Sequence, residues 1–272
     1  MISDFLEFEF LQHALIAAIL VSIAVGIIGS LIVVNRMVFL AGGIAHSAYG
    51  GIGLSLFFGF EILLSTSVFT IFIAFLMTYL ILYEKKNIDS YIGVIWASGM
   101  AFGIILSDLT PGYNVDMMSY LFGSILSVPK EDLIYMMVLD IIIILSVTIL
   151  YPIFLGISYD IEFAKLRKIH IAIYYLMIMI LAALSIVIAI RAVGLILVIA
   201  LMTIPTYISE KLSSSLKMMM VLSVIFAVIF SILGLILSYI YDVSSGASII
   251  AVSVTSFILF HILQRFRYNT KN

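Results

Sequence analysis

One histidine is the residue best suited to do chemistry in this sequence, because it stands in a run of small residues. The run from Ala41 to Gly53 reads AGGIAHSAYGGIG, with His46 near its centre and five glycines around it: Gly42, Gly43, Gly50, Gly51 and Gly53. Neutral imidazole is a common ligand of divalent transition metals. His46 is therefore a candidate metal ligand. The alternative is a neutral histidine that is hydrogen-bonded to the carbonyl of a neighbouring helix.

A second candidate is Asp140, which lies inside the long apolar run 131–155. A carboxyl group in such a run could serve helix packing or proton-linked transport. Its neighbours in the sequence are apolar, so they do not indicate which residue would pair with it. Sequence motifs for other chemistry are absent: there is no phosphate-binding G-x-x-x-x-G-K-[ST], no H-E-x-x-H and no G-x-S-x-G. We therefore expect that the chain is not an enzyme and does not itself hydrolyse ATP.

A charged loop at residues 158–170 separates two long runs of isoleucine, leucine, valine and methionine. Its acids, Asp160 and Glu162, precede its bases, Lys165, Arg167 and Lys168. That order matches the dipole of a short helix, which favours acids at its N-terminus and bases at its C-terminus. The loop is thus predicted to be a short helix that passes force or a signal to a soluble partner. The bases could also act as topology signals alone.

The elements around these residues are predicted to be membrane-spanning helices. Hydrophobic residues make up 64% of the chain and charged residues 10%, which indicates a polytopic membrane protein. The chain has no cysteine, so disulfides and thiolate metal sites are excluded. We expect one all-α transmembrane domain over residues 1–272, a bundle of eight or nine spanning helices. The candidate segments are 11–34, 38–60, 62–83, 91–108, 131–155, 170–190, 193–208, 217–241 and 246–264.

Two stretches fit this pattern less well. The segment 193–208 is short for a span, and 109–128 is semi-polar, which is typical of a re-entrant or surface helix. Within the segment 38–60, His46 lies eight residues from the inner end, about 12 Å deep in the membrane. An ionisable group at that depth is a candidate functional residue. The surrounding glycines let helices approach closely in lipid.

The distribution of charge predicts the orientation of the chain. With the N-terminus outside, only Lys130 and Arg191 among the basic residues fall on the outer side. The inner side then holds Arg36, Lys85, Lys86, Lys165, Arg167, Lys168, Lys211, Lys217, Arg265, Arg267 and Lys271. Basic residues favour the cytoplasmic side. We therefore expect a multi-pass protein of the cell membrane, with the 158–170 loop and the C-terminus in the cytoplasm.

Several short stretches, spread over nearly the whole chain, form a recognisable series. In chain order they are Ala45–Ala48 with Gly50–Gly53, Asp89–Gly93, Gly99 with Gly103, Asp116 with Tyr120–Gly123, Tyr159–Ala164, Val193–Val198 with Pro205, and Leu237–Asp242 with Ser245–Ala247. In this order the series resembles the permease subunits of bacterial and archaeal ABC importers for zinc, manganese or iron.

The resemblance implies a homodimer that works with cytoplasmic ABC ATPase subunits and an extracytoplasmic metal-binding protein. A divalent metal ion would be the transported substrate, and no permanently bound cofactor and no nucleic acid are expected. The resemblance also implies that residues 159–170 form a coupling helix that docks in a groove of the ATPase. The residues assigned to this contact are Tyr159, Asp160, Glu162, Ala164 and Lys165.

The sequence departs from the family pattern at three positions. Gly42 stands where many members have an aspartate four residues before the histidine, so the ligands that replace this aspartate stay open. Lys168 replaces a frequent glycine of the coupling helix, and Ser244 replaces a frequent proline. The alternatives are a permease for a chelated metal or a corrin, and an ion-coupled secondary transporter that uses Asp140. A membrane-embedded enzyme lacks paired catalytic residues.

Overall fold

The computed structural model describes residues 8–84, 86–111 and 117–269, and every regular element in these ranges is a helix. In chain order the elements are α2 (Glu9–Val34), α3 (Val38–Phe58), α4 (Ile62–Tyr83), α5 (Ile88–Asp108), α6 (Met117–Phe122), η1 (Ile125–Ser127), α7 (Lys130–Tyr159), α8 (Ile161–Leu166), α9 (Ile171–Val193), α10 (Val198–Leu212), α11 (Leu216–Tyr241) and α12 (Ser245–Asn269). Asp116, Lys85 and Lys271, used above, lie outside the described residues.

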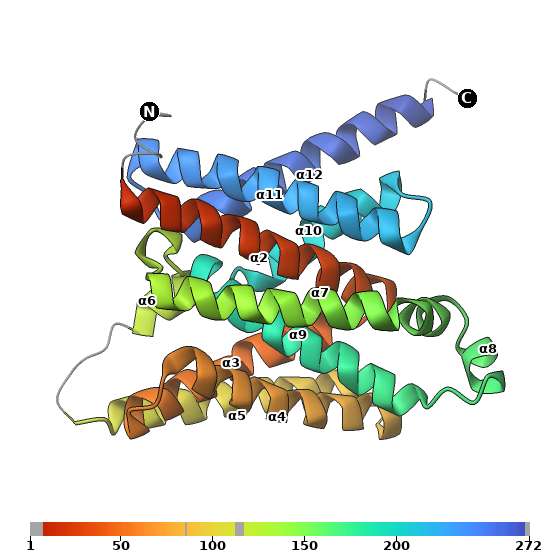
Figure 1. Cartoon of the computed structure of the whole chain (residues 1–272), viewed down its shortest axis with the longest axis horizontal. Helices are drawn as coiled ribbons and strands as arrows, with labels where there is room; N and C mark the ends of the chain where they lie inside the picture. Colours follow the sequence, from red (N-terminus) through yellow and green to blue (C-terminus); the bar gives the residue numbers. More distant parts are fainter. Residues whose placement is uncertain (1–7, 85, 112–116, 270–272) are drawn as a thin grey trace.

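Helix α2 is at the centre of the bundle, where it packs against α7, α9, α10 and α11 (Figure 1). Its inward positions are small, since Ala14, Ala17, Ala18 and Ala24 are all fully buried. In the most apolar stretch of α2, 72% of the residues are buried within the chain. Small side chains allow this close approach, which drives helix association where lipid surrounds the bundle.

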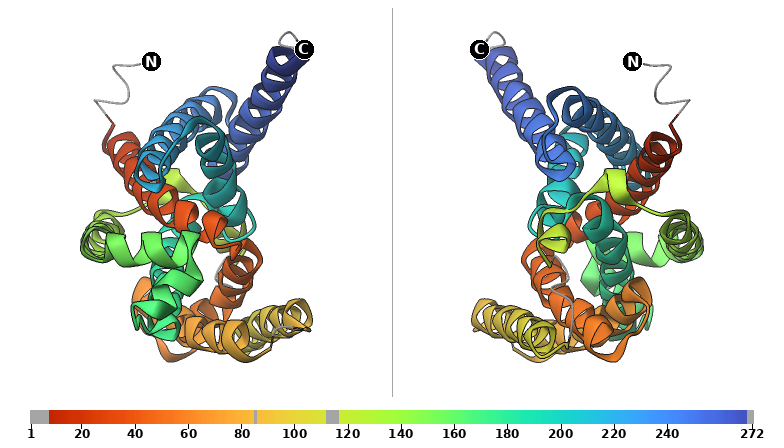
Figure 2. Two further views of the ribbon diagram at one scale, coloured as in Figure 1. Left: turned by 90° about the vertical axis from the view of Figure 1, so that its right-hand side faces the viewer. Right: turned by 90° about the vertical axis from the view of Figure 1, so that its left-hand side faces the viewer.

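Helices α5 and α12 are the least covered of the long apolar helices. Only 17% of the residues in the apolar stretch of α5 are buried, and 22% in α12. Figure 2 shows both helices extending from the same side of the bundle, with α3 and α10 between them. One side of the chain therefore presents two poorly covered helices that flank a pair of better-packed ones.

Glycines bring α3 and α5 into direct backbone contact. A Cβ atom at Gly53 would meet the backbone of Gly103, and one at Gly103 would meet the carbonyl oxygen of Tyr49. On the face toward α4, a Cβ at Gly50 would lie 2.6 Å from the Phe69 ring. Gly51 and Gly43 are equally crowded, by Thr66 of α4 and by Met77 of α4, respectively.

The all-α fold class is confirmed, and most of the predicted apolar segments correspond to helices of the structure. Among the described residues, seven helices are long and apolar enough to cross a membrane, namely α2, α4, α5, α7, α9, α11 and α12. The other two expected segments are α3, which has 21 residues but is diluted by glycine, and α10, which has 15. Fifteen residues rise only about 22 Å, short of a hydrocarbon core of about 30 Å.

The described part of the semi-polar stretch after α5 stays at one end of the bundle. It forms α6 and η1, which pack at the end of α9 that is remote from α8. Backbone N–H groups of Leu195 and Ile196 donate to the carbonyls of Tyr120 and Leu121, at 3.0 and 3.2 Å. Gly123 and Gly194 meet there with φ of 68° and 85°, a left-handed conformation that glycine adopts without strain.

Charged side chains divide between the two ends of the bundle. The turns next to α8 in space are those between α2 and α3, α4 and α5, and α10 and α11, and α12 ends on that side (Figure 1). These segments carry the basic residues Arg36, Lys86, Lys211, Lys217 and Arg265. Lys130 and Arg191 lie at the opposite end, at the start of α7 and the end of α9.

Candidate functional site

His46 lies between α3 and α5, and its hydrogen bond leaves one ring nitrogen available. The Nδ1 atom of the half-buried imidazole is 2.9 Å from the carbonyl oxygen of Gly42, one turn earlier in α3. Because a carbonyl only accepts, Nδ1 carries the proton and donates it. In the neutral ring Nε2 then keeps its lone pair, the arrangement that a metal-binding histidine uses.

Trp96 of α5 completes the immediate surroundings of the histidine. Its ring is stacked on the His46 imidazole with centroids 3.7 Å apart and an interplanar angle of 28°. The indole N–H donates to the sulfur of Met100, at 3.1 Å. The stack restricts the imidazole to one plane. Sequence reasoning missed Trp96, although its being the single tryptophan of the chain was an available signal.

Gly42 is closed off from the side where a longer residue would extend. A Cβ atom there would lie 2.9 Å from Cδ1 of Ile199 in α10. A carboxylate at this position would therefore displace Ile199. Among the described residues no group of three or more histidine, aspartate or glutamate side chains could hold a metal ion. In the described part of one chain, His46 is therefore a candidate ligand without a surrounding ligand cluster.

The loop between α7 and α9 folds into the short helix α8, with a cap at each end. The carboxylate of Asp160 accepts a hydrogen bond from the backbone N–H of Phe163 at 2.9 Å, which caps the N-terminus. The Lys165 ammonium is 2.7 Å from the carboxylate of Glu162. Ala164 is fully buried. The acids and bases therefore stabilise the helix locally, and Ala164 faces the body of the protein.

The C-terminal end of α8 places Lys168 in a left-handed backbone conformation. The N–H of Ile169 bonds to the carbonyl of Ala164, and the N–H of Lys168 to that of Lys165. These two bonds form a Schellman motif, in which the residue after the helix end has a left-handed backbone conformation. Lys168 is that residue, with a φ of 57°. A lysine therefore occupies a conformation that glycine would adopt at lower cost.

Exposed apolar side chains lie on α8 and on Tyr159, the last residue of α7. Tyr159 is 63% exposed and Leu166 is 83% exposed, with Ile161 and Phe163 also exposed. The Arg167 guanidinium lies 4.7 Å from the centre of the Phe163 ring. Exposed apolar groups mixed with charges, on a short element that projects from the end of the bundle (Figure 1), are typical of a protein contact surface.

At the opposite end, an ion pair joins α7 to α9. The Arg191 guanidinium binds the carboxylate of Asp132, and both side chains are largely buried. The guanidinium also lies 5.8 Å from the Tyr120 ring of α6. Burial raises the pKa of the Tyr120 phenol, and the Arg191 charge opposes this shift. Sequence reasoning placed Arg191 at the outer membrane surface but did not identify Asp132 as its partner.

Asp140 lies on α7 about two turns below Asp132, and only 3% of it is exposed. Neither carboxyl oxygen has a hydrogen-bond partner among the described residues, and Ser185 of α9 is the other buried side chain of this kind. His46 contacts Gly42 and Trp96, and Asp140 is not among these neighbours. The structure thus separates the two intramembrane candidates into different environments.

Comparisons with known proteins agree with this geometry. The model of a family described as the ABC 3 transport family matches residues 7–264. An uncharacterized membrane protein of Synechocystis is 45% identical, covering 93% of this chain and 90% of its own. The manganese transport system membrane protein MntC of Halalkalibacterium halodurans is 32% identical, covering 93% and 87%. The solved structure of PsaBC from Streptococcus pneumoniae in complex with Fab matches with a TM-score of 0.87 and 32% identity, over 95% of this chain and 93% of that chain.

Proposed function

The chain belongs to the ABC 3 transport family, and we propose that it is the membrane-spanning permease of an ATP-driven importer for a divalent transition metal ion. The observation that carries the proposal is the His46 imidazole, held in the interior of a spanning helix with Nε2 available. The manganese transport protein among its relatives supports manganese as the first substrate to test, with zinc and iron next.

His46 makes a transient contact with the passing ion in this proposal. A lone imidazole binds a divalent ion weakly, and a pathway site must release what it binds. Gly42 offers no carboxylate, and Ile199 fills the space beside it. The Trp96 stack contributes by holding the imidazole in position before the ion arrives. The imidazole therefore favours ions that bind nitrogen ligands, and its weak binding permits fast release of the ion.

The transport-competent form is a homodimer built on the side that carries α5 and α12. These two helices are apolar and poorly covered within one chain, at 17% and 22% burial. A second copy placed against this side would cover them (Figure 2). It would also bring a second α3, and a second His46, toward the same central space. The remaining ligands for the ion then come from the partner copy and from water.

Helix α8 is the coupling helix that receives the force of ATP hydrolysis on a cytoplasmic ATPase subunit. Its exposed Leu166, together with Tyr159 at the end of α7, supplies apolar contact surface. Asp160, Glu162 and Lys165 hold the helix in shape, and buried Ala164 connects it to the bundle. The gathering of basic residues at this end supports a cytoplasmic location for α8 and for the C-terminus. An extracytoplasmic binding protein then delivers the ion at the Arg191 end.

The proposal is tested by purifying the tagged chain from its native membrane and identifying the ATPase that comes with it. The complex is reconstituted in vesicles, and uptake of manganese, zinc and iron is measured with and without ATP. ATP-dependent uptake of one of these ions is the expected result. Uptake that needs only a proton gradient, and that Asp140→Asn abolishes, would instead identify an ion-coupled secondary transporter.

A further inference from the structure

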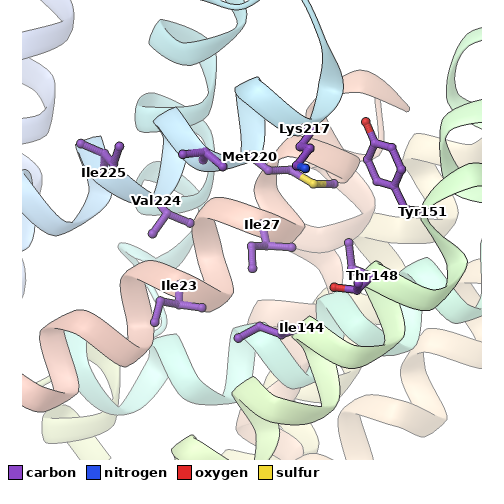
Figure 3. A pocket seen from close by; sticks show the side chains of 11 residues that line it. Ile23, Ile27, Ile144, Thr148, Tyr151, Lys217, Met220, Val224 and Ile225 are labelled. Carbon is purple, nitrogen blue, oxygen red and sulfur yellow. The ribbon is translucent and has the colours of Figure 1, made fainter.

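A long apolar groove lies between α2, α7 and α11, away from the His46 region. Its volume is about 550 Å³, and Figure 3 shows the side chains that line it. Ile23 and Ile27 of α2 form its floor, and Ile144 of α7 faces Val224 and Ile225 of α11 across it. The groove is open rather than enclosed, so an apolar ligand has access to it.

Polar side chains gather at one end of this groove. Thr148 and Tyr151 of α7 and Lys217 of α11 line the same end (Figure 3). Lys217 is the second residue of α11, at the end of the bundle that carries α8. Within the described ranges, its ammonium has no carboxylate partner, and the hydroxyls of Thr148 and Tyr151 make no hydrogen bond.

Most other hydroxyls of the spanning helices behave differently. Thr70 and Thr206, for example, donate to the carbonyl one turn earlier in their own helices, both at 2.8 Å. Such bonds satisfy a polar group inside lipid. The groups at the end of the groove are therefore three donors that remain available to a ligand, and one of them carries a positive charge.

The position of the groove indicates that it faces membrane lipid. It lies on the side of the bundle opposite α5 and α12 (Figure 2), so a dimer formed through those helices leaves it facing lipid. From Lys217 to Ile225 the wall formed by α11 rises about 12 Å. One leaflet of the hydrocarbon core is about 15 Å thick. The groove thus spans most of one leaflet and ends at its polar surface.

We propose that this groove binds one anionic phospholipid of the leaflet next to α8. An acyl chain lies along Ile27, Ile144 and Val224, and the phosphate binds the Lys217 ammonium with the hydroxyls of Thr148 and Tyr151. A charged donor makes the strongest hydrogen bonds to phosphate, and the cytoplasmic leaflet is rich in anionic lipid. Because α7 leads directly into α8, the lipid braces the helix that carries α8 against α11.

Native mass spectrometry of the full chain, purified with its ATPase, tests the proposal. The protein is titrated with phosphatidylglycerol or with phosphatidylcholine, and retained lipid is counted. We expect one tightly held phosphatidylglycerol per chain. Lys217→Gln should weaken its binding about fivefold and leave phosphatidylcholine unaffected. Ile144→Trp, which fills the groove, should reduce binding of both lipids.

Lys211→Gln is the matched control, because Lys211 lies at the same end but binds Glu210 and does not line the groove. Equal losses for Lys211→Gln and Lys217→Gln would reduce the effect to general charge attraction and overturn the proposal. Unchanged lipid retention in Ile144→Trp would also overturn it. Because the chain has no cysteine, crosslinking of Ile144→Cys to a second copy in lipid discs would show that protein fills the groove instead.

Discussion

Replacing Asp140 by leucine should make the protein more stable, an unusual result for a buried position. The carboxyl group is 3% exposed, and neither oxygen has a partner among the described residues. Burying a polar group without a hydrogen bond costs about 1–3 kcal/mol in proteins. Leucine removes that cost because its side chain carries no polar atom. At about 2–4 °C per kcal/mol in a protein of this size, the melting temperature should therefore rise by roughly 2–12 °C.

The control is Asp132→Leu, on the same helix, where the carboxylate is partly buried but paired. Asp132 binds Arg191, so its loss leaves a largely buried guanidinium unpaired. We expect a destabilisation of about 3 kcal/mol, with the opposite sign to Asp140→Leu. Thermal unfolding of the purified protein can be followed through the fluorescence of Trp96, since the chain has a single tryptophan. A lower melting temperature for Asp140→Leu would refute the reasoning, because it would mean that the carboxyl group has a stabilising partner.

The remaining predictions concern coupling, packing and orientation. Ala164→Glu should uncouple ATP hydrolysis from uptake, because it forces a charge into the buried contact of α8; normal transport by this variant in vesicles with the ATPase would exclude the coupling role. Gly53→Val should lower the yield of folded protein, because its side chain would meet the backbone of Gly103, whereas Gly93→Ala, with no atom within 4 Å, should not. A cysteine at Lys165 should react with an impermeant thiol reagent only from the cytoplasmic side, and labelling from outside would reverse the orientation.

The helices could be predicted from sequence because lipid leaves the backbone few choices. Every N–H and C=O inside a membrane needs an internal partner, so a long apolar run must be helical. The predicted segment 62–83 coincides with α4, and the predicted start at residue 217 is one residue from that of α11. The stretch 109–128 was harder, because its short helices depend on contacts with residues 194–196, which are distant in sequence.

Partners of the candidate residues could not be predicted in the same way. His46 was weighed as bonding to a neighbouring helix, but its Nδ1 bonds within its own helix to Gly42. Its neighbour Trp96 is 50 residues away and reaches it only through the glycine contacts of α3 with α5. The Asp132–Arg191 pair spans 59 residues and likewise depends on how two helices pack. The position of a residue along its apolar segment predicts its depth in the membrane. Which side chains it contacts depends on how the helices pack against one another.

Metal uptake by His46 variants tests the central claim most directly. The measurement compares wild type, His46→Ala, His46→Leu and the control His13→Leu in vesicles that contain the ATPase and the binding protein. His13 is near the N-terminal end of α2, 3.8 Å from Glu9. The proposal predicts that both His46 variants lose about tenfold or more of their uptake while assembly and basal ATP hydrolysis persist. Near-normal uptake of manganese, zinc and iron by either His46 variant would show that His46 only packs against Trp96 and plays no part in the path.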